Sequence, residues 1–138
     1  MRAGSRTLAL AVGALFLTPA MAQQPSSITL SCSGTGKLMI AADDSKQDPI
    51  NNVGMVVDFQ SKTVTFDNYK VPIERADSTM VLFRGSVTMT YANTRLKPVQ
   101  VDGSVDRITG SASVTFTHER VGDNAIWDLN CKPATRMF

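Results

Sequence analysis

Alternation of apolar and polar residues with a period of two constrains this chain most strongly. Ile28, Leu30 and Cys32 alternate with polar neighbours, and the same pattern recurs through the rest of the sequence. A period of two places the apolar side chains on one face of a β-strand. After residue 22, no segment carries the 3.6-residue stripe of an amphipathic helix. The sequence therefore predicts an all-β domain.

Ten short segments separated by turn residues show the pattern, and from them we expect eight or nine strands. The segments that show the pattern are 28–33, 37–41, 55–60, 63–67, 71–74, 79–84, 87–91, 99–105, 112–118 and 127–131. Pro72 lacks an N–H group, so segment 71–74 is expected to be an edge strand. Between two late segments, Asp106-Arg107-Ile108-Thr109-Gly110 has the composition of a hairpin turn, because Asp accepts backbone hydrogen bonds and Gly adopts left-handed backbone angles.

Many short strands joined by short turns favour a small antiparallel β-barrel of about eight strands, with a two-sheet β-sandwich as the alternative. Cys32 and Cys131 lie on the apolar faces of the first and last strands. A disulfide between them would bring these strands together, as barrel closure requires. An outer-membrane barrel is disfavoured because the outward positions are mostly Asp, Ser, Thr and Lys.

The first 22 residues have the features of a secretory signal peptide. Arg2 and Arg6 precede a short apolar run, and small residues lead to Ala22, where we expect cleavage. Residues 23–138 then form a single β-domain, and the expected location is the periplasm or the exterior of the cell. The apolar run is too short to span a bilayer as a helix, so no membrane span is expected.

Charge and residue types narrow the function. Of the 14 Lys and Arg residues, Arg2 and Arg6 lie in the leader, so the 12 that remain balance 12 Asp and Glu. A neutral domain is not typical of nucleic-acid binding. His118 is the single histidine, which disfavours a nucleophile–histidine catalytic unit. Segment 43–48 is acidic but lacks a calcium-loop pattern. We therefore predict no enzyme activity, no metal site and no cofactor.

A binding surface is the remaining expectation. Arg84, Tyr91, Arg95 and Arg107 would form a binding rim if their loops meet. The competing interpretation treats each arginine as a solvated charge balanced by a neighbouring carboxylate, such as Asp77 or Asp102.

Several short motifs carry a resemblance to known proteins. They are Leu30-Ser31-Cys32-Ser33-Gly34, the 57–64 hairpin, Gly103 to Gly110, and the ending Trp127 to Leu129, Cys131-Lys132-Pro133 and Phe138. With them, the chain resembles a group of small uncharacterised secreted proteins of alphaproteobacteria. Its size and terminal disulfide are also similar to those of periplasmic lysozyme-inhibitor barrels, a likeness of architecture alone.

Three functions follow as expectations. The first is an exported, non-enzymatic binding module that acts on an envelope protein partner. The second is a carrier of a small apolar ligand inside the barrel, which would need an unfilled interior. The third is a hydrolase of unknown specificity.

Overall fold

The computed structural model describes residues 25–39, 47–88, 90–91, 94–95, 98–118 and 124–134. All regular structure in these residues is β-strand, as the sequence predicted. The strands are β1 (Ser27–Met39), β2 (Gln47–Asp58), β3 (Thr63–Phe66), β4 (Tyr69–Ala76), β5 (Met80–Val87), β6 (Thr90–Tyr91), β7 (Thr94–Arg95), β8 (Val99–Asp106), β9 (Ser111–Thr117) and β10 (Asn124–Pro133).

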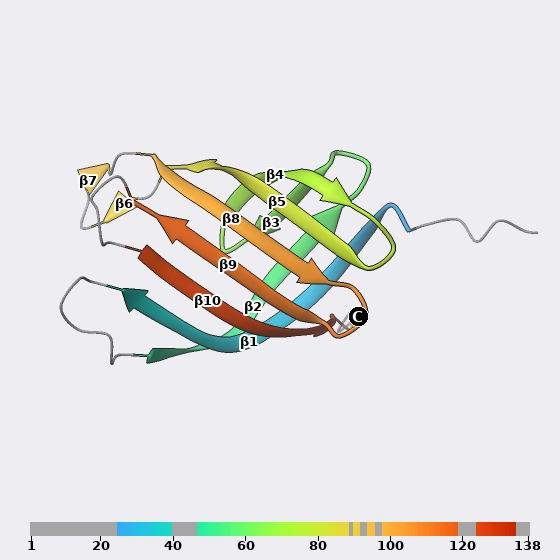
Figure 1. Ribbon diagram of the computed structural model, residues 1–138, viewed down its shortest axis with the longest axis horizontal. Coiled ribbons are helices and arrows are strands. Elements are labelled where there is room, and N and C mark those ends of the chain that lie inside the picture. Colours follow the sequence, from blue (N-terminus) through green and yellow to red (C-terminus); the bar gives the residue numbers. More distant parts are fainter. Residues whose placement is uncertain are drawn as a thin grey trace, which may run out of the picture.

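Eight of these strands form a closed antiparallel barrel, which confirms the predicted barrel over the sandwich (Figure 1). Each barrel strand pairs with its neighbours in sequence, with two exceptions: β5 pairs with β8, because β6 and β7 form a separate small sheet, and β1 pairs with β10. β1 closes the barrel by pairing with both β2 and β10. Closure satisfies the backbone groups that an open sheet would leave at its edges.

This up-and-down order gives the barrel two different ends. The short turns 59–62, 77–79 and 107–110 lie at one end, together with the start of β1 and the end of β10. We call it the turn end. The turn at 67–68 and the connection that carries β6 and β7 belong to the opposite end, which we call the far end (Figure 1).

Several strands are longer than their alternation indicated. β1 continues through Gly34 and Gly36, and so joins the predicted segments 28–33 and 37–41. A register shift lies between Cys32 and Gly34, opposite Asn52, whose φ is 54°. The Asn52 N–H donates to Ser33 Oγ over 2.9 Å. The alternation did not predict the full length of this strand, because its small residues supply little hydrophobic signal.

The expectation of an edge strand at 71–74 is wrong, because β4 pairs with both β3 and β5. Pro72 pairs with Thr63 of β3, whereas the pairing of β4 with β5 begins one residue later, at Ile73. The ring therefore lies past the β4–β5 ladder, where no N–H group is required.

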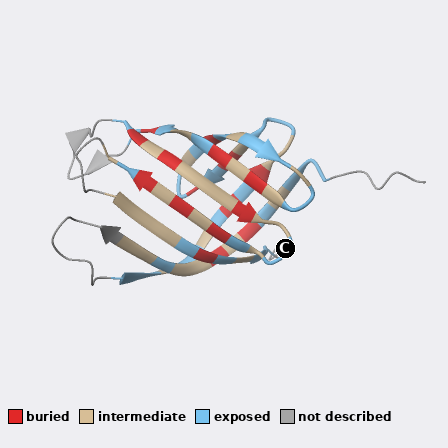
Figure 2. Cartoon of the chain, viewed as in Figure 1, coloured by how far each residue is buried: buried red, intermediate tan, exposed pale blue. Residues whose placement is uncertain are grey.

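The core is the inward face of the barrel strands. Red stripes of buried residues alternate with paler ones along β8 and β9 in Figure 2, as a period of two requires. The buried apolar residues are Leu30, Cys32, Met55, Val57, Val64, Phe66, Val71, Val81, Phe83, Val87, Val99, Val101, Val105, Ala112, Val114, Phe116 and Leu129.

Aromatic rings cross the interior and contact one another. The Phe66 ring centroid lies 5.8 Å from that of Phe83, 6.2 Å from Phe116 and 6.3 Å from Trp127. Trp127 also lies 5.1 Å from Phe116, and Tyr69 packs against Phe66 at 5.9 Å. These tilted and edge-on contacts are favourable ring geometries. Trp127 therefore packs, partly buried, against the phenylalanines of the core.

The predicted disulfide joins the two strands that close the barrel. Cys32 and Cys131 are direct partners in the β1–β10 register, and their sulfur atoms lie 2.09 Å apart. The bond links residues separated by 99 positions. Structural disulfides persist in oxidising compartments, so this bond is consistent with a protein located outside the cytosol.

Candidate functional site

Three turns build the turn end, and each is held by an aspartate. Asp58 accepts the backbone N–H groups of Gln60 and Ser61, each over 2.9 Å. Asp106 accepts those of Ile108 over 2.8 Å and Thr109 over 2.9 Å. These N–H groups stabilise the charged carboxylates, so the pKa of each aspartate is lowered.

The third turn has the most strongly held carboxylate. Asp77 accepts hydrogen bonds from the Thr79 hydroxyl over 2.7 Å and from the N–H groups of Thr79 and Met80, each over 2.9 Å. Arg75 adds an ion pair at 3.2 Å. Together, led by the Thr79 hydroxyl, these donors lower the pKa of Asp77 to about 2. The carboxylate therefore stays charged at neutral pH.

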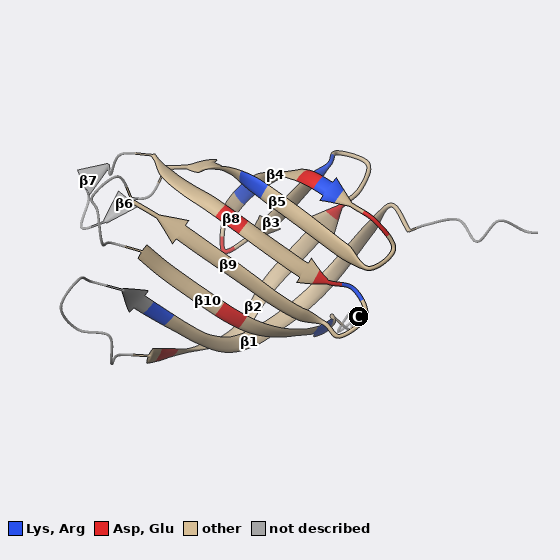
Figure 3. Ribbon diagram, in the orientation of Figure 1, with Lys and Arg blue, Asp and Glu red and all other residues tan. Residues whose placement is uncertain are grey.

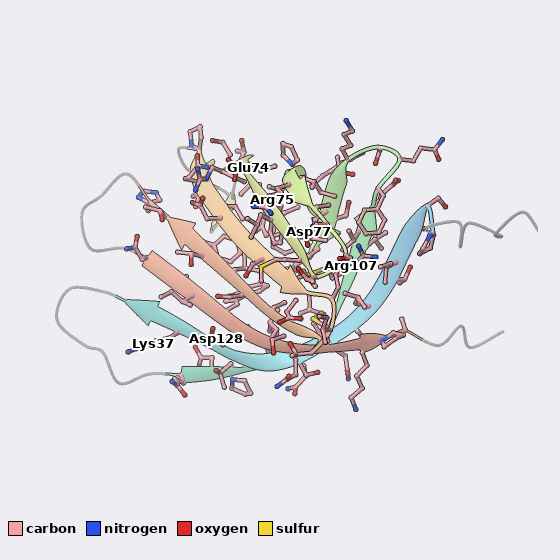
Figure 4. The ribbon with its side chains drawn as sticks, turned by 45° about the vertical axis from the view of Figure 1, so that its right-hand side comes forward. Lys37, Glu74, Arg75, Asp77, Arg107 and Asp128 are labelled. Atoms are coloured by element: carbon pink, nitrogen blue, oxygen red, sulfur yellow. A yellow bond between two sulfur atoms is a disulfide. The ribbon has the colours of Figure 1, made fainter. Side chains whose placement is uncertain are left out.

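Arg107 connects the three turns. Its backbone N–H donates to Thr79 O over 2.8 Å, and its guanidinium donates to the carbonyl oxygen of Asp77. The guanidinium carbon also lies 5.0 Å from the ring centroid of Phe59, a cation–π distance. Figure 4 shows Arg75, Asp77 and Arg107 together at this end. The side chain is thus fixed by groups from two other turns.

Ile108 lies at the tip of the same turn, with 75% of its surface exposed. Phe59, Arg75, Arg107 and Ile108 are hereafter called the turn-end patch. The patch combines two guanidinium groups with an aromatic ring and an exposed aliphatic side chain. This residue combination is common where one protein contacts another.

Arg84 lies away from this patch, on the outer wall of the barrel. It faces Asp102 in the β5–β8 register and forms an ion pair with it, and Glu74 on β4 lies 3.7 Å from its guanidinium. The hydrogen bond with Asp102 is the main reason why the pKa of Arg84 is raised. Figure 3 shows the charged positions spread over the strands and turns. For Arg84 the structure agrees with the interpretation of a balanced surface charge.

Tyr91 and Arg95 belong to β6 and β7, the two-stranded sheet of the far end. Arg107 lies at the turn end, on the other side of the barrel (Figure 1). The structure therefore divides the four residues of the expected rim among three places. It brings Arg107 together with Phe59 and Asp77 instead.

The outer wall also carries two shallow depressions that share Ser104 and Ser113. One, of about 370 Å³, is bordered by Asp106, Asp128 and Asn130. The other, of about 270 Å³, is bordered by the Glu74–Arg84–Asp102 group. Both lie over the short outward side chains of β9, among them Ser113. Both are open to water, and polar and apolar groups share their walls.

The remaining candidates for chemistry are placed as follows. His118 directly follows β9 and is partly buried. Segment 43–46 lies outside the described residues. Within the described part of the chain, no three His, Cys, Asp or Glu side chains are grouped as metal ligands would be.

Sequence reasoning missed Phe59 and Asp77 as parts of the site. One signal was available, because Asp58, Asp77 and Asp106 each stand at the start of a turn with a Ser or Thr three residues or fewer later. Repetition of that pattern indicates three similar turns. It does not indicate that the turns touch, which depends on the closed barrel.

Comparisons with protein-family models, curated proteins and solved structures find no match. The resemblances drawn from the short motifs therefore stay predictions. In the described ranges, no helix has the length and apolar character needed to cross a membrane.

Proposed function

We propose that this protein is an exported, non-enzymatic binding module of the periplasm that acts on an envelope protein partner. The observation that carries the proposal is the turn-end patch, where an arginine is held rigidly between an aromatic ring and a neighbouring turn while an isoleucine faces water. Rigid Arg and aromatic residues beside exposed apolar surface are the side chains that contribute most at protein interfaces.

Ring packing in the centre of the barrel supports a protein partner over a small apolar ligand. A carrier needs a hollow lined by apolar side chains. At the level of Phe66, rings from β3, β4, β5, β9 and β10 occupy the centre of the barrel instead, at centroid separations of 5.1 to 6.3 Å. Binding through the outer surface leaves this packing intact.

The periplasmic location rests on two features. The first 22 residues have signal-peptide character, and a structural disulfide such as Cys32–Cys131 is typical of an oxidising compartment. A neutral domain after the leader also agrees with a protein that binds one partner rather than polyanions in general.

Native mass spectrometry of the protein recovered from a bacterial periplasm tests the proposal against the carrier function. The denatured mass should equal that of residues 23–138 less two hydrogens for the disulfide. The native monomer should have the same mass, with no small molecule retained. A discrete apolar adduct in the native spectrum would instead establish the carrier. Substrate turnover that is lost in His118→Ala would contradict the non-enzymatic part of the proposal.

A further inference from the structure

Ile108 exposes a large apolar side chain at the tip of the 107–110 turn. Among the described residues, the exposed large apolar side chains are Val56, at 36%, and Ile108, at 75%. Single exposed apolar residues are ordinary on protein surfaces. Exposure therefore identifies Ile108 as a candidate contact residue, and the construction of its turn supports a contact.

Hydrogen bonds within the turn and to β10 hold the turn that carries Ile108. Its own N–H and that of Thr109 donate to the Asp106 carboxylate, and Gly110 N donates to Asp106 O over 3.0 Å. Gly110 O in turn accepts the N–H of Cys131 over 2.8 Å, which ties the turn to β10. The backbone beneath Ile108 is therefore ordered before any partner arrives. Such preorganisation lowers the entropy cost of association.

The charged residues around Ile108 indicate what charge a complementary partner surface would carry. No carboxylate in the described residues lies within ion-pair distance of Arg107, whose guanidinium is held over Phe59. The turn-end carboxylates Asp58, Asp77 and Asp106 each accept backbone N–H groups of their own turns. The basic residues of this end are Lys62, Arg75, Arg107 and Lys132. A partner surface with carboxylates around an apolar pocket would complement this arrangement.

We propose that the turn-end patch docks on a protein that presents an apolar pocket bordered by carboxylates, with Ile108 inserted in the pocket and Arg107 paired with a carboxylate at its border. This inference rests on the proposed binding function. The partner is a folded protein and not a membrane, because the apolar contact is a single side chain on a rigid turn.

Site-specific photocrosslinking in bacterial cells tests the docking surface. The full chain, with its leader, carries p-benzoylphenylalanine in place of Ile108 in one variant. In two control variants the same group replaces Thr65 on β3 or Ser86 on β5, both exposed on the outer wall. The expected result is a light-dependent adduct with one envelope protein from position 108 and none from positions 65 or 86.

Binding to the purified crosslinked protein then measures the contribution of the side chain. Ile108→Asp should weaken the affinity by about 10- to 100-fold, the effect of withdrawing one apolar side chain from a pocket. Thr65→Asp is the matched control and should change the affinity by less than about twofold. Both variants should unfold at the wild-type urea concentration, because both positions are exposed. Raising the salt concentration should weaken wild-type binding, since Arg107 is paired in the complex.

The outcomes distinguish failure of the docking surface from failure of the proposed binding function. Adducts from position 65 or 86 but not from 108 would overturn the docking surface and leave the binding function standing. Adducts between two copies of this chain, or an Ile108→Asp variant that binds as tightly as wild type, would also overturn the inference. If no position gives an adduct, the proposed binding function itself is refuted.

Discussion

Adding one methyl group at Gly103 should destabilise the barrel, because the Phe83 ring occupies the space where a Cβ atom would lie. Gly103 on β8 and Phe83 on β5 are direct partners in the ladder. A Cβ at position 103 would lie 2.0 Å from Phe83 Cζ and 2.2 Å from Cε2. Ordinary carbon contacts are about 3.5–4.0 Å, so the ring would have to move by roughly 1.5 Å.

The ring has little room to move. Phe83 is 1% exposed, and its centroid lies 5.8 Å from that of Phe66, which contacts three further rings. Forcing an extra methyl into such a core costs about 1–3 kcal/mol. At about 4 °C per kcal/mol for a domain of this size, the melting temperature of Gly103→Ala should fall by about 4–12 °C.

Urea unfolding followed by the fluorescence of Trp127, the single tryptophan, measures the effect. Gly54→Ala is the matched control, because a Cβ there has no heavy atom within 4 Å, and it should leave stability nearly unchanged. In the double variant with Gly103→Ala and Phe83→Leu, the smaller side chain at position 83 should relieve the clash. The double variant should therefore lose less stability than the sum of the losses of the two single variants. A Gly103→Ala midpoint equal to wild type, or equal losses at positions 54 and 103, would refute this account of the packing.

Three further predictions concern the bonds and turns of the turn end and the barrel seam. Replacing Cys32 and Cys131 by alanine should lower the melting temperature by about ten degrees or more, since closing a loop of about 100 residues is worth roughly 4–5 kcal/mol in the chain-entropy description; an unchanged transition in calorimetry would contradict it. The pKa of Asp77 is lowered to about 2 from 3.8, so its charged form stabilises the fold above about pH 4, and this contribution is lost as the pH falls toward 2. Over that interval, urea unfolding at each pH should show that the Asp77→Asn variant loses less stability than wild type. Gly110→Ala should destabilise the protein by about 1–3 kcal/mol, because φ is 78° and a Cβ would lie 2.5 Å from the Cys131 carbonyl oxygen; Gly54→Ala serves again as control, and equal midpoints would show that the turn adopts another conformation.

Local patterns were enough to predict the class of the fold. Each strand face is encoded by neighbours two residues apart, so Val99, Val101 and Val105 identified the inward face of β8 without any knowledge of its partners. The 106–110 turn was predictable for the same reason, since Asp106 and Gly110 act within their own turn. Cys32 and Cys131 fell on inward faces, and that parity already favoured closure.

The extents of the strands were harder to predict. β1 passes through Gly34 and Gly36, and β5 passes through Gly85, where the alternation fades. Glycine fits at Gly36 because the side chains of Ile50 and Trp127, from β2 and β10, crowd the position. Crowding between residues of different strands cannot be read from the local sequence pattern, so these strands were predicted as shorter segments.

The candidate site likewise combines features that the local sequence predicts with features that depend on the tertiary structure. The sequence by itself determined that the chain is all-β, that its cysteines can meet and that residues 106–110 turn tightly, and it favoured a barrel over a sandwich, because these properties depend on residues close together in the chain or on the parity of a strand. Only the tertiary structure decided that Arg84 is balanced by Asp102 and that Arg107 lies over Phe59 and beside Asp77. Such contacts join residues from separate turns and strands, and they arise only when barrel closure fixes the register of every strand against its neighbours.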